Sequence, residues 1–174
     1  MAIRDEIVRL ALWWADPGKY KPLPDELVSF FETSGTEQVP TLDEAKKSLM
    51  TLSNGVRLGG QVKHWCGIFA CHILCRAGVD VKWTFLGGKV VGKSENQIRY
   101  VPGRDGMKPG DIAIIPAAQH HFIVIDADYD TNTLHTVDGN TEGQYIREIH
   151  DKKIRYTGPN ASNLTPYGYY RVLV

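Results

Sequence analysis

The stretch His64-Trp65-Cys66-Gly67-Ile68-Phe69-Ala70-Cys71-His72-Ile73-Leu74-Cys75-Arg76-Ala77-Gly78 is the most apolar run of the chain and decides its fold. Its apolar residues recur at helical spacing, and further apolar residues fill the other side, so we expect a buried helix. Gly78 suits the left-handed position that ends a helix. Cys66 then stands at the helix N-terminus, where unpaired N–H groups and the helix dipole favour a thiolate. A cysteine there suits a nucleophile if a histidine reaches it. The alternative is a small apolar residue that begins a core helix.

The composition and charge of the chain exclude several classes of protein. The 174 residues carry 20 Lys plus Arg and 20 Asp plus Glu, so no overall charge favours nucleic acid or an anionic membrane as a partner. No apolar run is long enough to cross a bilayer, and the N-terminus lacks the pattern of a secretory signal. We therefore expect a single domain over residues 1–174 that is synthesised in the cytoplasm, binds no nucleic acid and does not insert into membranes.

The three cysteines, Cys66, Cys71 and Cys75, all fall in the expected core helix. Disulfides within a helix are geometrically poor, and an odd number of cysteines leaves at least one free thiol. The spacing does not match the close cysteine pairs of zinc sites. We expect reduced thiols and neither a metal ion nor another cofactor, with Cys71 and Cys75 as core residues.

The chain divides into a helical first part, residues 1–60, and a second part, residues 61–174, that holds the core helix and a sheet. Expected helices cover residues 3–15, 25–32 and, after the capping box Thr41-Leu42-Asp43-Glu44, residues up to about Leu52. Expected strands cover residues 112–115, 121–125, 133–137, 145–149, 153–156 and 167–174. Helices followed by consecutive antiparallel strands predict an α+β fold.

Three separated pieces of sequence fit one catalytic scheme. Cys66 begins the core helix, His121 begins the second of these strands, and Asp138-Gly139-Asn140 ends the third. Adjacent antiparallel strands place the start of one beside the end of the next, so we expect His121, Asp138 and Asn140 at one sheet edge. A cysteine nucleophile needs a histidine that takes its proton and a third group that orients the imidazole. The helix can bring Cys66 to this edge.

Four motifs carry a wider resemblance. They are Trp65-Cys66-Gly67-Ile68-Phe69, Lys108-Pro109-Gly110-Asp111-Ile112, His121-Phe122-Ile123-Val124-Ile125 and Val137-Asp138-Gly139-Asn140-Thr141. Their order and gaps resemble the CHAP family, which belongs to the NlpC/P60, papain-like group of cysteine amidases and peptidases. The resemblance implies a papain-like fold, with a central Cys-bearing helix packed on an antiparallel β-sheet. It implies Cys66 as the nucleophile, His121 as the general base and then acid, and Asp138 and Asn140 at the polar positions.

The sequence departs from the family pattern around the histidine. His121 is followed by Phe122-Ile123, where the family usually has a small or aliphatic residue and then glycine. His120 stands where the family more often has serine or glycine, so it remains a second candidate for the base and a candidate for substrate contact. Strand alternation points the two side chains in opposite directions, and we favour His121 because it adjoins the apolar run. His135 and His150 lie on expected strands without a matching partner and receive no role.

Other candidates surround this constellation. We expect the backbone N–H of Cys66 to stabilise an oxyanion together with a second donor. Gln61 is a candidate for that donor by analogy with papain-like enzymes. Trp65 and Trp83 are candidates to line a substrate groove, and core packing is the alternative for both.

The leading functional hypothesis is a cysteine amidase or endopeptidase that hydrolyses an amide bond of bacterial peptidoglycan, or of its muropeptides, through a thioester intermediate. The substrate follows from the resemblance alone. The alternatives are a papain-like toxin that deamidates or cross-links protein glutamine, and a non-catalytic binding module on the same scaffold. Because no signal peptide is evident, an antibacterial effector exported by a non-Sec route or a phage lysin released by lysis fits, and an immunity protein is a candidate partner.

Overall fold

The computed structural model describes residues 2–50, 65–116, 119–141 and 144–174, which form helices around a large sheet. The helices are α1 (Ile3–Ala15), α2 (Pro24–Thr33), α3 (Leu42–Leu49), α4 (Cys66–Arg76) and α5 (Ala161–Leu164). The strands are β1 (Lys19–Tyr20), β2 (Val81–Thr84), β3 (Lys89–Gly92), β4 (Ile98–Pro102), β5 (Ile112–Ile115), β6 (His120–Asp128), β7 (Thr133–Thr141), β8 (Tyr145–Lys153) and β9 (Gly168–Val172). The expected α+β class is confirmed.

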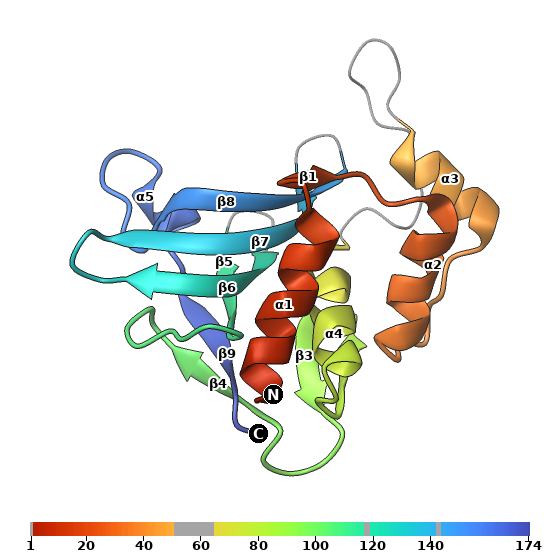
Figure 1. The fold of residues 1–174 in the computed structure, drawn as a ribbon, viewed down its shortest axis with the longest axis horizontal. Helices are drawn as coiled ribbons and strands as arrows, with labels where there is room; N and C mark the ends of the chain where they lie inside the picture. Colours follow the sequence, from red (N-terminus) through yellow and green to blue (C-terminus); the bar gives the residue numbers. More distant parts are fainter. Residues whose placement is uncertain (1, 51–64, 117–118, 142–143) are drawn as a thin grey trace.

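Within the described residues, seven strands form one sheet in the order β1-β8-β7-β6-β5-β9-β4, and β2 and β3 form a separate hairpin. Every pair of neighbouring strands in both sheets is antiparallel. The three longest strands, β6, β7 and β8, follow one another in the chain and in space, as Figure 1 shows. This meander carries the C-terminal part of the candidate site.

Helices α1 and α4 pack on one face of the sheet against β6 and β7, and α2 and α3 lie beyond α4 (Figure 1). The first nine residues of α4, Cys66–Leu74, are all buried. A helix that is apolar on every side must be covered on every side, and here α1, α2, the β2–β3 hairpin and the sheet surround it. The most apolar stretch of the chain therefore lies at the centre of the fold.

The sheet separates two hydrophobic clusters. Ile123 of β6 and Val137 of β7 belong to the cluster under α1 and α4, whereas Phe122 and Val124 belong to a cluster on the opposite face. Phe122 pairs with Asp138 across the β6–β7 ladder. Directly paired residues point to the same face of a sheet, so the Asp138 side chain lies on the face away from α4. This register decides which histidine can meet Asp138.

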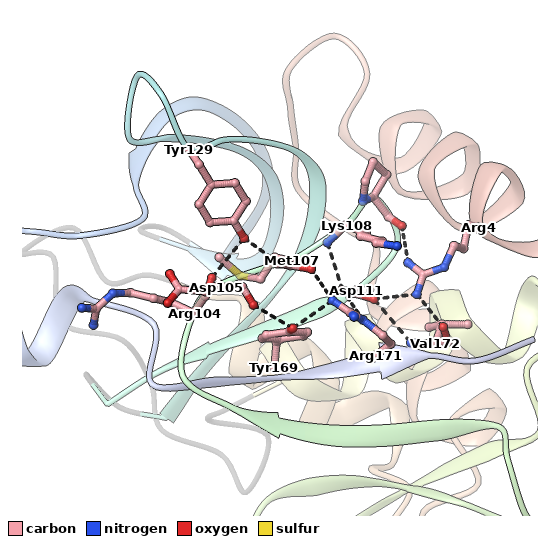
Figure 2. Close-up of polar contacts among 12 residues, drawn as sticks. Arg4, Arg104, Asp105, Met107, Lys108, Asp111, Tyr129, Tyr169, Arg171 and Val172 are labelled. Carbon is pink, nitrogen blue, oxygen red and sulfur yellow. Dashed lines mark hydrogen bonds and ion pairs between the residues drawn. The ribbon is translucent and has the colours of Figure 1, made fainter.

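The turn before β5 joins the two ends of the chain, as Figure 2 shows. Asp111 is fully buried, and its carboxylate accepts hydrogen bonds from Arg4 of α1 at 2.8 Å and from the backbone N–H of Lys108 at 3.0 Å. From β9, the backbone N–H of Val172 donates to it at 3.4 Å, and Arg171 Nε lies 3.5 Å away. One carboxylate thus connects α1, β5 and β9.

Some element boundaries differ from the expectation. The third helix ends at Leu49 rather than near Leu52. Residues 154–156 form no strand, because pairing with β7 extends β8 to Lys153 instead. The edge strand β4 was not expected, since most of its residues are exposed and show no alternation of buried and exposed positions. Pairing with β9, rather than its own sequence pattern, makes this segment a strand.

Candidate active site

Cys66 is the first residue of α4, where the sequence predicts it. It is a free thiol with 5% of its surface exposed. Trp65, the residue that precedes the helix, makes no side-chain hydrogen bond to the first turn. The backbone N–H groups at this end therefore lack a side-chain cap from Trp65, and the positive end of the helix dipole favours negative charge on the thiol or on a bound oxyanion.

Asp138 of β7 holds His120, the first residue of β6. His120 Nε2 lies 2.8 Å from Asp138 Oδ2, and Asp138 is 1% exposed. Its other oxygen, Oδ1, accepts a hydrogen bond of 2.6 Å from the hydroxyl of Thr136. The carboxylate is therefore fixed in place, and with it the orientation of the imidazole. This leaves Nδ1 of His120 as the nitrogen that can exchange a proton with Cys66.

Lys152 of β8 is a polar partner of Asp138 that the sequence did not reveal. Its ammonium donates to Asp138 Oδ2, the same oxygen that His120 contacts, and lies 4.0 Å from the centre of the Phe122 ring. Burial alone would raise the pKa of Asp138, but Lys152 and His120 outweigh it and lower the pKa to about 2. Lys152 falls between two separate expected strands in the sequence, so no pattern pointed to it.

The pKa values of Cys66 and His120 shift in opposite directions. Burial by itself would raise the pKa of the Cys66 thiol, but attraction to His120 and, to a smaller degree, to His121 lowers it to about 5. Burial would lower the pKa of His120, but Asp138 and the Cys66 thiolate raise it to about 9. Between about pH 5 and pH 9 the pair therefore exists as thiolate and imidazolium.

This charge state predicts the pH dependence of alkylation. The rate at which iodoacetamide modifies Cys66 is expected to rise with pH through a midpoint near 5 and to stay level up to about 9, because only the thiolate reacts. Mass spectrometry of the Cys66 peptide measures the rate, and the half-buried Cys75 of the same helix provides an internal comparison. A midpoint near 9, the ordinary value for a thiol, would contradict the predicted ion pair.

His121 lies on the α4 side of β6 in an aromatic pocket. Its ring stacks on Tyr170, with 6.5 Å between centroids, and meets the edge of Trp83 at 5.1 Å. His121 is near enough to Cys66 to help lower the thiol pKa, yet neither of its ring nitrogens reaches a hydrogen-bond partner among the described residues. His121 thus lies among aromatic rings within reach of Cys66 but, unlike His120, has no carboxylate partner among the described residues.

The expected pairing of His121 with Asp138 is corrected by the register of the sheet. Because Phe122 pairs with Asp138, the alternate position His120 shares the Asp138 face, and His121 points the other way. The sequence argument placed the right strands at the right edge. It could not predict on which face of the sheet each histidine side chain lies, because a shift of the strand register by one residue exchanges the two faces.

The two tryptophans occupy different surroundings. Trp65 is fully buried, and its indole N–H donates to Gln144 Oε1 at 2.9 Å, so it packs the core and cannot line a substrate groove. Trp83 is nearly buried and lies against Gly67 in the first turn of α4, where a Cβ atom would overlap the indole ring. The absence of a side chain at Gly67 therefore lets Trp83 approach the start of the helix and His121.

A cavity of about 210 Å³ extends outward from Trp83, between the β2–β3 hairpin and the segment after α2. Its lining consists of residues Gly35, Thr36, Glu37, Gln38, Lys82, Trp83, Thr84, Phe85 and Leu86. Trp83 both lines the cavity and contacts His121. Trp83 thus remains a candidate for substrate contact.

Two further site residues were expected from the sequence, Asn140 and Gln61. Asn140 adopts a left-handed backbone conformation with φ of 56°, at an irregularity of the β7–β8 ladder between Asp138 and Thr141. It therefore lies at the same end of β7 as Asp138, as expected. Gln61, the candidate second oxyanion donor, lies outside the described residues.

Comparisons with known proteins do not assign the chain to a family. No protein-family model, no curated protein and no solved structure matches it. In the described ranges, no helix combines the length and the apolar character that crossing a membrane requires.

Proposed function

We propose that this protein is a papain-like cysteine hydrolase of amide bonds, with Cys66 as the nucleophile, His120 as the general acid and base, and Asp138 as the residue that orients His120. The observation that carries the proposal is that His120, the first residue of β6, contacts Asp138 at 2.8 Å and also interacts with the thiol of Cys66, the first residue of α4. The nucleophile, the base and the orienting group come from α4, β6 and β7, and their order of contacts is that of a catalytic triad.

The chemistry follows from this order of groups. The Cys66 thiolate attacks the carbonyl carbon, and the backbone N–H groups at the start of α4 stabilise the developing oxyanion. His120 donates its Nδ1 proton to the leaving amine as the C–N bond breaks, which leaves an acyl group on the sulfur as a thioester. Neutral His120 then takes a proton from water, whose oxygen attacks the thioester. The carboxylic acid leaves, and the thiolate and the imidazolium are restored.

The proposed substrate is an amide bond of bacterial peptidoglycan, and its support is the resemblance of the four motifs to a family dominated by cell-wall hydrolases. Trp83, which lies against Gly67 next to Cys66, also lines a cavity of about 210 Å³ that offers space for part of such a substrate. Action on the wall requires export or release from the producing cell, and an immunity protein is a proposed partner if the protein is an antibacterial effector.

Replacing Cys66 by alanine is expected to abolish release of muropeptide fragments from purified peptidoglycan, because no thioester can form. Mass spectrometry of the digest measures the products and identifies the bond that is cut. Cys71→Ala is the matched control, since this buried thiol of the same helix lies five residues further along and interacts with Ser34 O at 3.8 Å and with the Cys75 thiol rather than with a histidine. Fragments released equally by wild type and Cys66→Ala would refute the proposed nucleophile.

The same experiment separates two other functions. If peptidoglycan stays intact but a protein in a host lysate gains about one dalton or becomes cross-linked in a Cys66-dependent manner, the triad acts on protein glutamine. If neither substrate changes and Cys66 alkylates as slowly as an ordinary buried thiol, the chain is a binding module without catalysis.

A further inference from the structure

A second group of chemically active side chains lies on the β7–β8 ladder, apart from the proposed catalytic residues. His135 of β7 and Glu148 and His150 of β8 bring one nitrogen or oxygen atom each to within 4.8 Å of the others. His135 Nε2 lies 2.7 Å from Glu148 Oε1, and His150 Nε2 lies 3.4 Å from the same oxygen. The two imidazole rings stack with their centroids 4.2 Å apart. Two imidazole nitrogens and one carboxylate oxygen thus lie close together.

The backbone around His135 is irregular on both sides. The β6–β7 ladder shifts register between Val124 and Asp126, and the β7–β8 ladder shifts between Leu134 and Thr136. Such bulges change the direction of a side chain and often occur at binding sites. His135 also pairs with Asp126 across the β6–β7 ladder, which places a further carboxylate on the neighbouring strand.

We propose that His135, Glu148 and His150 bind a divalent transition-metal ion of the zinc class. Imidazole nitrogen and carboxylate oxygen bind such an ion at about 2.0–2.2 Å, so neighbouring ligand atoms around a tetrahedral ion lie about 3.3 Å apart. The two distances to Glu148 Oε1, 2.7 Å and 3.4 Å, lie on either side of this value. The two imidazole rings are stacked at 26° to one another, so binding requires them to turn until the lone pairs of both nitrogens point to the ion.

The donor set selects among metals. Calcium and magnesium prefer sites made of oxygen atoms, whereas imidazole suits zinc, cobalt, nickel and copper. The His150 side chain is 70% exposed, so the site opens to solvent, and water supplies the remaining coordination position. The chemistry thus favours an ion bound by three protein ligands over a closed structural centre with four.

The proposed ion would join β7 to β8 close to the positions that orient the catalytic histidine. Asp138 follows His135 by three residues on β7, and Lys152 follows His150 by two on β8. An ion that binds the folded chain and not the unfolded chain stabilises the folded state by mass action. The site would therefore hold together the ladder from which Asp138 and Lys152 project.

Cobalt titration tests this proposal without reference to activity. Chelator-treated Cys66→Ala protein, which lacks the catalytic thiol as a competing ligand, is titrated with Co²⁺ and followed by its visible d–d absorption. One equivalent is expected to saturate the signal, Zn²⁺ is expected to displace it, and Ca²⁺ and Mg²⁺ are not. Saturating Zn²⁺, about a hundredfold above the dissociation constant, is expected to raise the Tm of the wild-type protein by about 5 °C or more.

The variants His150→Gln and Glu148→Gln are expected to weaken Co²⁺ binding at least tenfold, since each removes one ligand. Asp151→Asn is the matched control, because this exposed carboxylate adjoins His150 on β8 and is not one of the three clustered residues. Absence of binding, equal binding by all variants, or thiolate-to-cobalt charge-transfer absorption from Cys71 or Cys75 would each overturn the proposal. Absence of binding would mean that the cluster is only a hydrogen bond between His135 and Glu148.

Discussion

Replacing His120 by phenylalanine is expected to lower kcat/KM for amide hydrolysis about 10³-fold, because a positioned general acid and base contributes about 10² to 10⁴. The variant loses the proton that His120 delivers to the leaving amine and the contact of 2.8 Å with Asp138. It also loses the larger of the two histidine contributions that lower the Cys66 pKa. Initial rates on a muropeptide substrate, measured between about pH 5 and 9, give the comparison.

His121→Phe is the matched variant and is expected to retain activity within about tenfold of the wild type. Phenylalanine fills the same slot between Tyr170 and Trp83 and removes two buried ring nitrogens that have no partner among the described residues, so the Tm is not expected to fall. Thermal melts of both variants show whether a loss of rate is a loss of fold. If His121→Phe is inactive and His120→Phe is active in folded protein, His121 is the base and the proposed triad is wrong.

The Asp138 carboxylate has two positively charged neighbours rather than one. Both His120 Nε2 and Lys152 Nζ contact Oδ2, and Thr136 contacts Oδ1. A carboxylate held in this way stays ionised at any pH at which the thiolate exists, since its pKa is about 2 and that of Cys66 is about 5. Asp138 can therefore orient His120 over the whole pH range in which Cys66 is nucleophilic.

The position of Cys66 could be predicted from the sequence because its signals are local. The apolar run, the helix start and Gly78 all lie within fifteen neighbouring residues. The strand order β5-β6-β7-β8 was also accessible, because short turns join consecutive antiparallel strands. These two inferences sufficed to bring the helix start and the ends of β6 and β7 together.

The choice between His120 and His121 could not be predicted, because it depends on the pairing of Phe122 with Asp138. A shift of one residue would exchange the two faces of β6 and leave its hydrophobic pattern equally acceptable, since residues 121–125 are buried on both faces. The His135–Glu148–His150 cluster escaped prediction for a related reason. It depends on two register shifts that no alternation pattern encodes.

Replacing Asp111 by alanine is expected to lower the free energy of unfolding by about 3 kcal/mol, the cost of leaving buried partners of an ion pair unmatched. Arg4 and the backbone N–H groups of Lys108 and Val172 lose their hydrogen-bond acceptor, and Arg171 loses a negatively charged neighbour at 3.5 Å. The expected value lies at the low end for such changes, because the two arginine side chains remain 25% and 21% exposed and water can hydrate them. Urea unfolding at unchanged m-value measures the loss.

Asp105→Ala is the matched control from the same region (Figure 2). The Asp105 side chain is 75% exposed and its partner Arg155 is 57% exposed, so loss of this ion pair is expected to change the stability by less than about 1 kcal/mol. Equal effects of the two substitutions would show that Asp111 does not fasten α1 to β9.

If the motif that contains Asp111 serves the fold and not the chemistry, Cys66 in folded Asp111→Ala protein keeps its alkylation midpoint near 5. The substitution then lowers the stability without changing the reactivity of the thiol, because the groups that set the pKa of Cys66 lie on α4, β6 and β7 and none of them contacts Asp111.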